Sequence, residues 1–404
     1  MLKITFAKQI VMNVLITSND PYPQFIGGDK RVALILAKEW KWYGHEVFFL
    51  CYSPSPLRKA EVEGIEQLFF PDNNNLFSES NLSFFSKTIM ERKVQIVLHQ
   101  HPKTPEFNKL CFALHTLVKI ISVVHFDIAH EEKVLARSFF VRMRNGSNIK
   151  RWIIDGLLYV KYLLFAKRKQ HSELVRLYTD IYDHSDCVAL LSSSCIDSFI
   201  TYVPYANRGK LWAVNNPIKP IEYIPTIPKE KIVLWVGRLD MGAKRVDYML
   251  RIWREINQTH SDWQLKILGS GDWDYWRSII VSYDIKNAEI VGFCNPSEYY
   301  AKASILCMTS VTEGWGMVLV EAQQYGCVPM AYRSYAALDE IITDGENGYN
   351  IKAFDQKEYV TKLRRLMNDS ELRHRMAIQG LENVKRLHVD KIAKTWISHF
   401  ESML

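Results

Sequence analysis

Residues 13–52 read NVLITSNDPYPQFIGGDKRVALILAKEWKWYGHEVFFLCY, and this stretch contains one complete strand–helix–strand unit. Its apolar run at 13–17 predicts a buried strand, residues 28–44 show the spacing of an amphipathic helix that ends at Gly44, and residues 45–52 predict a second strand. A strand, a crossover helix and another strand in this order form part of a parallel sheet. The stretch therefore predicts the α/β class.

The same alternation continues along the chain. Further strands are predicted at 94–100, 120–126 and 187–192, and then at 231–237, 263–269, 288–293, 304–310 and 327–333. Four prolines between residues 217 and 228 predict an extended connection between two domains. We expect two doubly wound, Rossmann-like domains at 1–215 and 232–386, a linker at 216–231 and a final helix at 387–404. In such sheets the binding crevice lies beyond the carboxyl ends of the strands.

The composition is typical of a globular protein, with 48% hydrophobic and 24% charged residues among 404. The seven cysteines are odd in number, scattered and without a CxxC pair, which favours reduced thiols in a cytosolic protein. No apolar run reaches the roughly 18 residues that span a bilayer, and the N-terminus lacks a signal-peptide pattern. Met12 begins a clearer strand than Met1, so residues 1–11 are interpreted as an upstream extension.

One basic segment carries the whole net charge of +7. Residues 133–176 contain eleven Lys or Arg against two acidic residues, which gives 11 − 2 = +9 and leaves 7 − 9 = −2 for the rest. Within it, residues 151–169 combine an apolar stretch with Asp155 and Lys161, a pattern that suits a helix lying on an anionic membrane surface better than a membrane span. The alternative is a crossover helix packed on the N-terminal sheet. Nucleic acid is disfavoured because no binding module accompanies the charge.

The stretch TEGWGMVLVEA, residues 312–322, follows a predicted strand. Glu313 is placed in the loop, because Gly314 and Gly316 do not suit a helix interior, and the helix is predicted to begin near Met317. No Ser, Thr, Asp or Asn caps this start, so its first N–H groups could bind an anionic ligand. The alternative is a solvated glycine-rich turn.

A second motif, VGRLDMGAKRVDYML at 236–250, places Arg238 at the end of a strand and Lys244 six residues later. Arginine grips phosphate with a planar fork and lysine adds a point charge, so the pair could clamp a diphosphate. The alternative is two surface cations beside Asp240 and Asp247.

The remaining candidates are weaker. Gly27 and Gly28 lie between the first strand and its helix and could approach a ligand closely, but they do not form GxGxxG and also suit a simple turn. His125 ends a predicted strand and could reach into the crevice, whereas His99 and His101 are interpreted as hydrogen-bonded loop histidines. No His, Cys or carboxylate cluster has metal-ligand spacing, so no metal is expected.

Together these residues resemble the retaining glycosyltransferases of family 4, which have the GT-B fold of two Rossmann-like domains facing a central cleft. The resemblance rests on Glu313 and Glu321 with seven residues between them, on GRLDMGAK, on LGSGD, on DGENGY, on NNP at the linker and on the glycine pair with its helix. The match is specific over about 232–350 and loose over the N-terminal half.

The resemblance implies a role for each matching residue. Arg238 and Lys244 would hold the diphosphate of a nucleotide-sugar, Glu313 would contact the donor sugar and Glu321 the ribose. The backbone at Gly314, Trp315 and Gly316 would shape the sugar pocket, with the N–H groups near Met317 and Val318 facing the phosphate. The loop at Gly27 and Gly28 would close over the donor, His125 would lie near the sugar, and the final helix would pack back on the N-terminal domain. The long, aromatic loop before Gly27 departs from the family pattern.

The activity implied is metal-independent retaining transfer of a sugar from a nucleotide-diphosphate donor to a glycan or lipid-linked glycan acceptor. The expected setting is surface-polysaccharide or lipopolysaccharide assembly, with the protein in the cytoplasm and peripheral on the inner face of the membrane. The N-terminal domain would bind the acceptor and the C-terminal domain the nucleotide-sugar, which is a substrate, so no cofactor is expected. Two alternatives are a GT-B nucleotide-sugar epimerase or hydrolase, and an inactive nucleotide-sugar-binding subunit.

Overall fold

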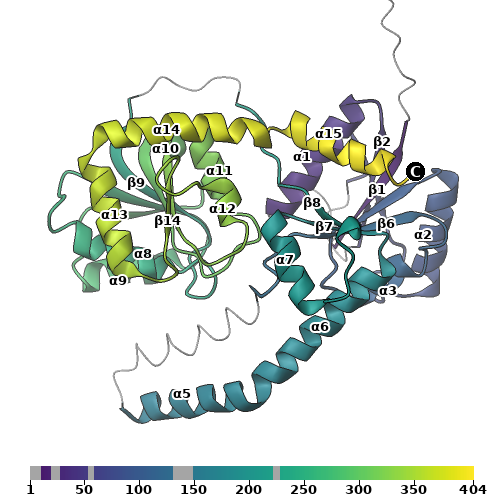
Figure 1. The fold of residues 1–404 in the computed structure, drawn as a ribbon, viewed down its shortest axis with the longest axis horizontal. Coiled ribbons are helices and arrows are strands. Elements are labelled where there is room, and N and C mark those ends of the chain that lie inside the picture. The colour runs from purple at the N-terminus through teal and green to yellow at the C-terminus, as the bar shows by residue number, and fades with distance from the viewer. Residues whose placement is uncertain (1–10, 20–27, 53–58, 131–148, 222–227) are drawn as a thin grey trace, which may run out of the picture. The chain divides into compact units, whose positions relative to one another are not determined.

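The computed structural model describes residues 11–19, 28–52, 59–130, 149–221 and 228–404 (Figure 1). The chain divides into two compact units. Unit 1 contains Met1–His125, Glu173–Lys219 and His388–Leu404, and unit 2 contains Phe126–Ser172 and Pro220–Leu387. The chain therefore passes between the units more than once, and its last helix belongs with its first strands.

Unit 1 is built on an eight-stranded sheet in the order β3-β4-β2-β1-β5-β6-β7-β8. All neighbouring strands are parallel except the β3–β4 pair, and Val14 on β1 lies opposite Val47 on β2 and Ile96 on β5. The strands are buried apolar runs, as expected for a parallel sheet covered on both faces. Their bounds are β1 Asn13–Ser18, β2 Glu46–Cys51, β3 Glu61–Val62, β4 Ile65–Phe69, β5 Ile96–His99, β6 Lys119–Val124, β7 Cys187–Leu190 and β8 Leu211–Ala213.

The last helix, α15, packs against the first helix, α1, within unit 1. Trp40 on α1 and Trp396 on α15 meet edge to face with ring centroids 6.1 Å apart, and the Trp40 indole Nε1 donates to the Ala393 carbonyl at 3.3 Å. Both tryptophans are buried, so α15 contributes core side chains to this unit. The helices with residues in unit 1 are α1 Gly28–Trp42, α2 Glu79–Glu91, α3 Pro105–Phe112, α6 Lys167–His184, α7 Ser193–Tyr202, the 3-10 turn η2 Arg208–Lys210 and α15 Val389–Glu401.

Unit 2 is built on a six-stranded, wholly parallel sheet in the order β11-β10-β9-β12-β13-β14. Its core is rich in aromatic residues, including the fully buried Trp235, Trp253 and Trp263. The first strand, β9, is central and pairs with both β10 and β12, which brings the loops after these strands to one edge. The strands are β9 Glu230–Val236, β10 Gln264–Leu268, β11 Ala288–Gly292, β12 Ala303–Met308, β13 Val328–Tyr332 and β14 Tyr349–Ile351.

The helices from β9 onward connect these strands or follow β14, and several of them bury one apolar face. α8 shows this pattern clearly, because Val246, Met249, Leu250 and Trp253 are buried at helical spacing. The helical elements are α5 Ile149–Lys161, the π-helix η1 Tyr162–Ala166, α8 Val246–Ile256, α9 Trp273–Ser282, α10 Ser297–Lys302, α11 Met317–Gln324, α12 Leu338–Ile341, α13 Gln356–Asn368, α14 Ser370–Val384 and the 3-10 turn η3 Lys385–Leu387.

The described part of the basic segment, from Ile149 onward, forms one helical run through α5, η1 and α6 (Figure 1). The two ends of this run differ. Residues 174, 178, 181 and 182 of α6 are buried, as is Tyr162 of η1, whereas five described aliphatic side chains of α5 and η1 are exposed. The exposed members are Ile154, Leu157, Leu158, Val160 and Leu163.

The predicted elements are confirmed wherever the sequence showed clear periodicity, within one or two residues at their ends. The interpretation of His99 as a loop residue is wrong, because His99 lies fully buried within β5. The elements that carried too little pattern to be predicted are mostly short, such as β3, β8, β14 and α12. The DGENGY loop precedes β14, where the Asn347 side chain accepts from the Thr343 N–H at 2.8 Å and closes the turn.

Candidate functional site

At the carboxyl edge of the unit 2 sheet, a glycine lies at the end of each of three adjacent strands or directly after it. Gly237 follows β9, Gly269 follows β10, and Gly292 ends β11. Gly237 donates its N–H to the Leu268 carbonyl at 3.0 Å, and Gly269 donates to the Gly292 carbonyl at 2.8 Å. A Cβ added to Gly269 would lie 1.7 Å from the Gly237 carbonyl oxygen, so only glycine permits this close approach. The edge is thus lined by backbone.

Lys244 and Glu313 meet beside this edge. The Lys244 Nζ lies 2.5 Å from Glu313 Oε1, and the Ser310 hydroxyl donates to the same oxygen at 2.6 Å. The side chains of Lys244 and Glu313 are 30% and 11% exposed, so the ion pair is partly withdrawn from water but still reachable. A cation, a carboxylate and a hydroxyl in one place can bind both an anion and sugar hydroxyl groups.

The two loops that carry this pair are joined through their backbones. Val311 donates its N–H to the Ala243 carbonyl at 2.7 Å, and the Thr309 hydroxyl is within hydrogen-bond reach of the Lys244 and Arg245 carbonyls. Arg245 is 1% exposed, has φ 55°, and forms two hydrogen bonds with the Asp247 carboxylate at 2.7 and 2.6 Å. These contacts fix the position of Lys244 relative to Glu313.

Arg238 follows β9 but does not join this ion pair. Its Nε donates to Asp240 Oδ2 at 2.8 Å, and its side chain is 67% exposed. Asp240 Oδ1 also accepts from the N–H groups of Gly242 and Lys244, at 2.9 and 3.0 Å. In this structure Arg238 thus matches the alternative considered for it, a surface cation beside Asp240. Sequence reasoning missed the structural part that Asp240 plays in shaping this loop.

Helix α11 begins as predicted at Met317, and its start has no side-chain cap. Gly316 precedes it with φ 93° and ψ 51°, a left-handed conformation that favours glycine. A Cβ on Gly316 would lie 2.5 Å from the Tyr335 hydroxyl, so Tyr335 covers this residue. Trp315 is 2% exposed, and its Nε1 has no hydrogen-bond partner among the described residues. Gly314, Met317 and Val318 are partly exposed.

Glu321 lies one turn inside α11, away from Glu313 along the chain. Its Oε2 accepts a hydrogen bond from the Tyr300 hydroxyl at 2.9 Å. The two glutamates of the motif therefore have different neighbours, a lysine and a serine for one and a tyrosine for the other. Tyr300, Ser310 and Tyr335 were not predicted, because nothing in their local sequence distinguishes them from ordinary core or loop residues.

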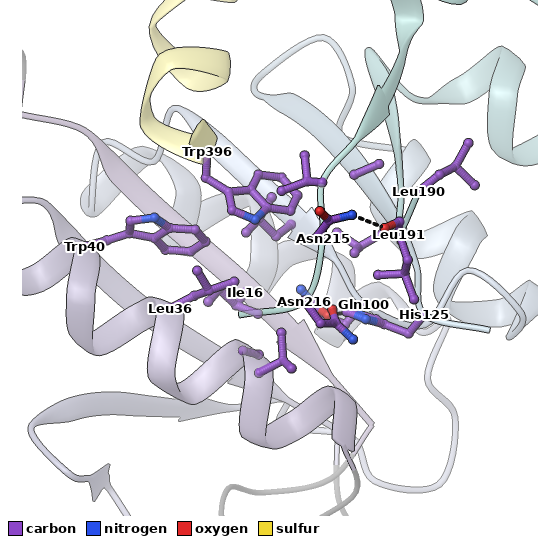
Figure 2. Close-up of a pocket in the computed structure, with 16 residues that line it drawn as sticks. Ile16, Leu36, Trp40, Gln100, His125, Leu190, Leu191, Asn215, Asn216 and Trp396 are labelled. Carbon is purple, nitrogen blue, oxygen red and sulfur yellow. Dashed lines mark hydrogen bonds between the residues drawn. The ribbon is translucent and has the colours of Figure 1, made fainter. Parts of the chain in front are cut away.

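His125 lies in unit 1, immediately after β6, and its Nε2 forms a short hydrogen bond with Gln100 Oε1. Both side chains line a cavity of about 10 Å³ whose other walls include Trp40 and Trp396 (Figure 2). This volume is near the lower limit for one water molecule and too small for a sugar. Gly28 is the first residue of α1 and is exposed, whereas Gly27 lies outside the described residues.

The segment after His125 belongs to unit 2 and contacts the start of the glutamate motif. The Thr312 hydroxyl donates to Asp127 Oδ2 at 2.9 Å, and His130 Nδ1 lies 3.3 Å from the same hydroxyl. Thr312 and Asp127 are both buried. A buried carboxylate is stable only when it is hydrogen-bonded, so this contact anchors the residue next to Glu313.

Two other kinds of chemistry, at cysteine thiols and at a metal ion, concern residues in the described part of the chain. The seven cysteines all lie in the described ranges and none of them forms a disulfide there, and burial raises the pKa of Cys307 and Cys327 to about 12, so these two are inert thiols. Among the described residues, no group of three or more His, Cys, Asp or Glu could hold a metal ion.

Comparison with known proteins finds a family model that matches part of this chain. Residues 221–382 match the family model described as "Glycosyl transferases group 1". The match covers less than half of the chain. It covers most of the second part of unit 2, including Lys244, Glu313 and Glu321.

Curated relatives of the group 1 segment come from several bacteria. An uncharacterized glycosyltransferase of Haemophilus influenzae is 30% identical over 173 residues, which is 42% of this chain and 48% of the relative. An amylovoran biosynthesis glycosyltransferase of Erwinia amylovora is 30% identical over 171 residues, 42% of this chain and 47% of that protein. The chain thus spans about half the length of these curated relatives.

Solved structures match the chain over nearly its whole length and identify the fold. The apo form of the lipopolysaccharide outer core galactosyltransferase WaaB is 19% identical, with a TM-score of 0.71 over 97% of this chain and 100% of that one. Anabaena HepE in complex with UDP is 15% identical, with a TM-score of 0.72 and the same coverage. The chain thus has the predicted GT-B fold.

Proposed function

We propose that the protein is a retaining glycosyltransferase of family 4, which moves a sugar from a nucleotide-diphosphate donor to a glycan or lipid-linked glycan. The observation that carries the proposal is the contact between Lys244 and Glu313 beside the carboxyl edge of the unit 2 sheet. The names of the relatives support the setting, since one acts in amylovoran biosynthesis and another, from Campylobacter jejuni, transfers N-acetylgalactosamine to a glycan on a diphospho-undecaprenol carrier.

The proposed chemistry places negative charge on the diphosphate as the bond between the sugar anomeric carbon and the phosphate oxygen breaks. Lys244, Arg238 and the N–H groups at the start of α11 would stabilise that charge, and electrostatic stabilisation of this kind is usually the largest catalytic contribution. Arg238 would leave Asp240 to do so, and its 67% exposed side chain is free to turn. These groups would provide the charge compensation without a metal.

Glu313 would hold hydroxyl groups of the donor sugar, and the backbone of Gly314, Trp315 and Gly316 would shape that pocket. The acceptor hydroxyl would attack the anomeric carbon from the face that the diphosphate leaves, and its proton would pass to the departing phosphate oxygen. This step conserves the anomeric configuration. His125, from unit 1, would lie near the sugar, and the loop at Gly27 and Gly28 would close over the donor.

The direct test is transfer activity of Lys244→Ala and Glu313→Ala with a panel of nucleotide-sugars and lipid-linked acceptors. We expect each variant to lose at least about 100-fold in turnover, because each removes a charged partner of the transition state. Lys266→Ala and Glu289→Ala are matched controls, since these residues form another 2.5 Å ion pair on the same sheet. The controls should retain activity and all variants should stay folded.

Other outcomes distinguish the alternatives. Release of free sugar without an acceptor would support a hydrolase, conversion of the donor sugar would support an epimerase, and tight nucleotide binding without turnover would support an inactive subunit. Near-normal transfer in both site variants would contradict the assignment of the site.

We further propose that the protein is peripheral on the inner face of the cytoplasmic membrane, held there by the helical run through α5, η1 and α6. Ile154, Leu157 and Leu158 follow helical i, i+3, i+4 spacing on one face of α5 and are 55%, 65% and 43% exposed. Lys167, Arg168 and Lys169 follow directly and are exposed. An exposed apolar face next to cations suits the surface of an anionic bilayer. In the described part of the chain, no helix is both long and apolar enough to cross a membrane.

Co-sedimentation with vesicles of mixed anionic and neutral lipid tests this second proposal. Reversal of Lys167, Arg168 and Lys169 to glutamate should lower binding at least about tenfold, because each cation near an anionic surface contributes roughly 1 kcal/mol. Leu157→Asp should lower binding as well, while Val281→Asp is the control because Val281 is 79% exposed on α9. Unchanged binding in the charge-reversed and Leu157 variants would contradict membrane contact by this run.

A further inference from the structure

The loop between β9 and α8, residues 237–245, carries both cations of the proposed diphosphate site. Arg238 lies near the start of this loop and Lys244 near its end. Asp240 lies between them and contacts both, Arg238 through its side chain and Lys244 through its backbone N–H. A single carboxylate therefore contacts both cationic residues.

The first oxygen of this carboxylate holds the loop in shape. Asp240 Oδ1 accepts from the N–H groups of Gly242 and Lys244 at 2.9 and 3.0 Å. An Asp or Asn side chain that accepts from an N–H group two residues later is a common way to fix a turn. The Lys244 carbonyl also accepts from the Thr309 hydroxyl at 3.2 Å. The main chain of Lys244 is thus held on both sides, and its ammonium group reaches Glu313 from a fixed position.

The second oxygen has the opposite effect on the other cation. Asp240 Oδ2 accepts from Arg238 Nε at 2.8 Å, so the charge of this arginine is already compensated. The Arg238 side chain is 67% exposed, which makes the pair weak enough for a diphosphate to displace. Only the fraction of molecules in which Arg238 is released can use it for binding, and this lowers the apparent affinity for the ligand.

We propose that Asp240 is a positioning residue that acts on the two cations in opposite directions. Through Oδ1 it holds Lys244 where a diphosphate can bind, and through Oδ2 it withholds Arg238 from the same ligand. The inference rests on the proposed function, in which both cations bind the diphosphate of the donor. It adds that the loop binds less tightly than its two cations allow, because a carboxylate of the same loop competes with the ligand.

Asp240→Asn separates the two oxygens. The amide oxygen can still accept from the two loop N–H groups, whereas the amide NH₂ group cannot accept from Arg238. In titration calorimetry with the tightest binder among UDP, GDP and ADP, we expect this variant to bind about threefold more tightly, equivalent to roughly 0.7 kcal/mol. The gain is modest because exposed ion pairs contribute little. Asp262→Asn is the matched control, since it removes the same charge from an exposed pair with Lys231 at the opposite end of β9.

Two further variants assign each effect to its oxygen. Arg238→Ala should weaken binding, and adding Asp240→Asn to it should tighten binding less than about 1.5-fold, because no arginine remains to be released. Asp240→Ala also releases Arg238 but provides no acceptor for the loop, so it should bind at least about fivefold more weakly than Asp240→Asn. If Asp240→Ala does not fold, the other variants still test the release of Arg238.

Three results would overturn the role of Asp240. They are unchanged or weaker binding in Asp240→Asn, a full threefold gain in the Arg238→Ala background, and equal affinities for the Asn and Ala variants. Each of these leaves the proposed function in place, because the unmodified protein still binds the ligand. If the unmodified protein binds no nucleoside diphosphate, the proposed function itself falls, and the role of Asp240 falls with it.

Discussion

At the scale of single residues, the site depends on contacts between side chains far apart in the sequence. Lys244 and Glu313 are 69 residues apart and meet because β9 and β12 are neighbours in the sheet. Each was predicted as a candidate, but their pairing was not, since strand order is absent from local periodicity. The charge on Lys244 is already compensated, so a bound diphosphate has to compete with Glu313 for it.

A residue-scale prediction concerns His99, whose burial in β5 lowers its pKa to about 4. An unfolded chain would hold a histidine near its ordinary value of about 6.5. Below that value the unfolded state binds a proton that the folded state does not, so stability is full above about pH 6.5 and falls progressively toward pH 4. The loss should approach 3 kcal/mol, at about 1.4 kcal/mol for each unit of the pKa difference.

Thermal unfolding between pH 7.5 and 4.5 measures this effect. His99→Gln should show a smaller fall in Tm across that range than the unmodified protein, whatever its stability at neutral pH. His115→Gln is the control, because His115 is exposed. Equal slopes in the His99 and His115 variants would show that another group controls the acid sensitivity.

At the scale of elements, the start of α11 shows how backbone conformation shapes the site. The sequence predicted an uncapped helix after two glycines, and the structure adds the reason for the second one: Gly316 is left-handed and is covered by the Tyr335 hydroxyl. The conformation could be anticipated from the residue type, but the tyrosine could not, because it approaches from the loop after β13.

Gly316→Ala is therefore expected to impair this element in two ways. The left-handed backbone costs an alanine about 1–2 kcal/mol, and its Cβ would also collide with the Tyr335 hydroxyl at 2.5 Å. Gly345→Ala separates the two effects, because Gly345 has φ 81° with no atom within 4 Å of an added Cβ. The Gly316 variant should lose more Tm than the Gly345 variant and should bind nucleoside diphosphates more weakly. Similar losses in both would show that backbone strain alone is responsible.

At the scale of the whole molecule, the alternation of strands and helices was enough to predict an α/β chain with two parallel sheets, whereas the GT-B fold was implied by the resemblance to a known family. The grouping of residues 126–172 with unit 2 was not predicted. It depends on long-range contacts such as the hydrogen bond between Thr312 and Asp127, which span 185 residues and leave no periodic pattern. For the same reason the sequence indicated one basic helix but could not show which of its apolar side chains are exposed.

A prediction at this scale concerns the contribution of α15 to unit 1. Trp396→Ala removes a buried ring that contacts Trp40 and Phe400, and such truncations cost about 3–5 kcal/mol. Calorimetry with and without nucleoside diphosphate should show a lowered transition for unit 1, while the transition raised by nucleotide, assigned to unit 2, stays in place. Trp42→Ala, at a 76% exposed position, should change little. A fall confined to the nucleotide-sensitive transition would contradict the prediction.

The position of α15 also has a consequence for how the protein is made. A ribosome releases the strands of unit 1, interrupted by residues 126–172 of unit 2, then the rest of unit 2, and only afterwards the helix that covers Trp40. Part of the aromatic surface of unit 1 is therefore exposed to water until the second sheet has been synthesised. A chaperone that binds exposed aromatic residues would find its substrate in this interval.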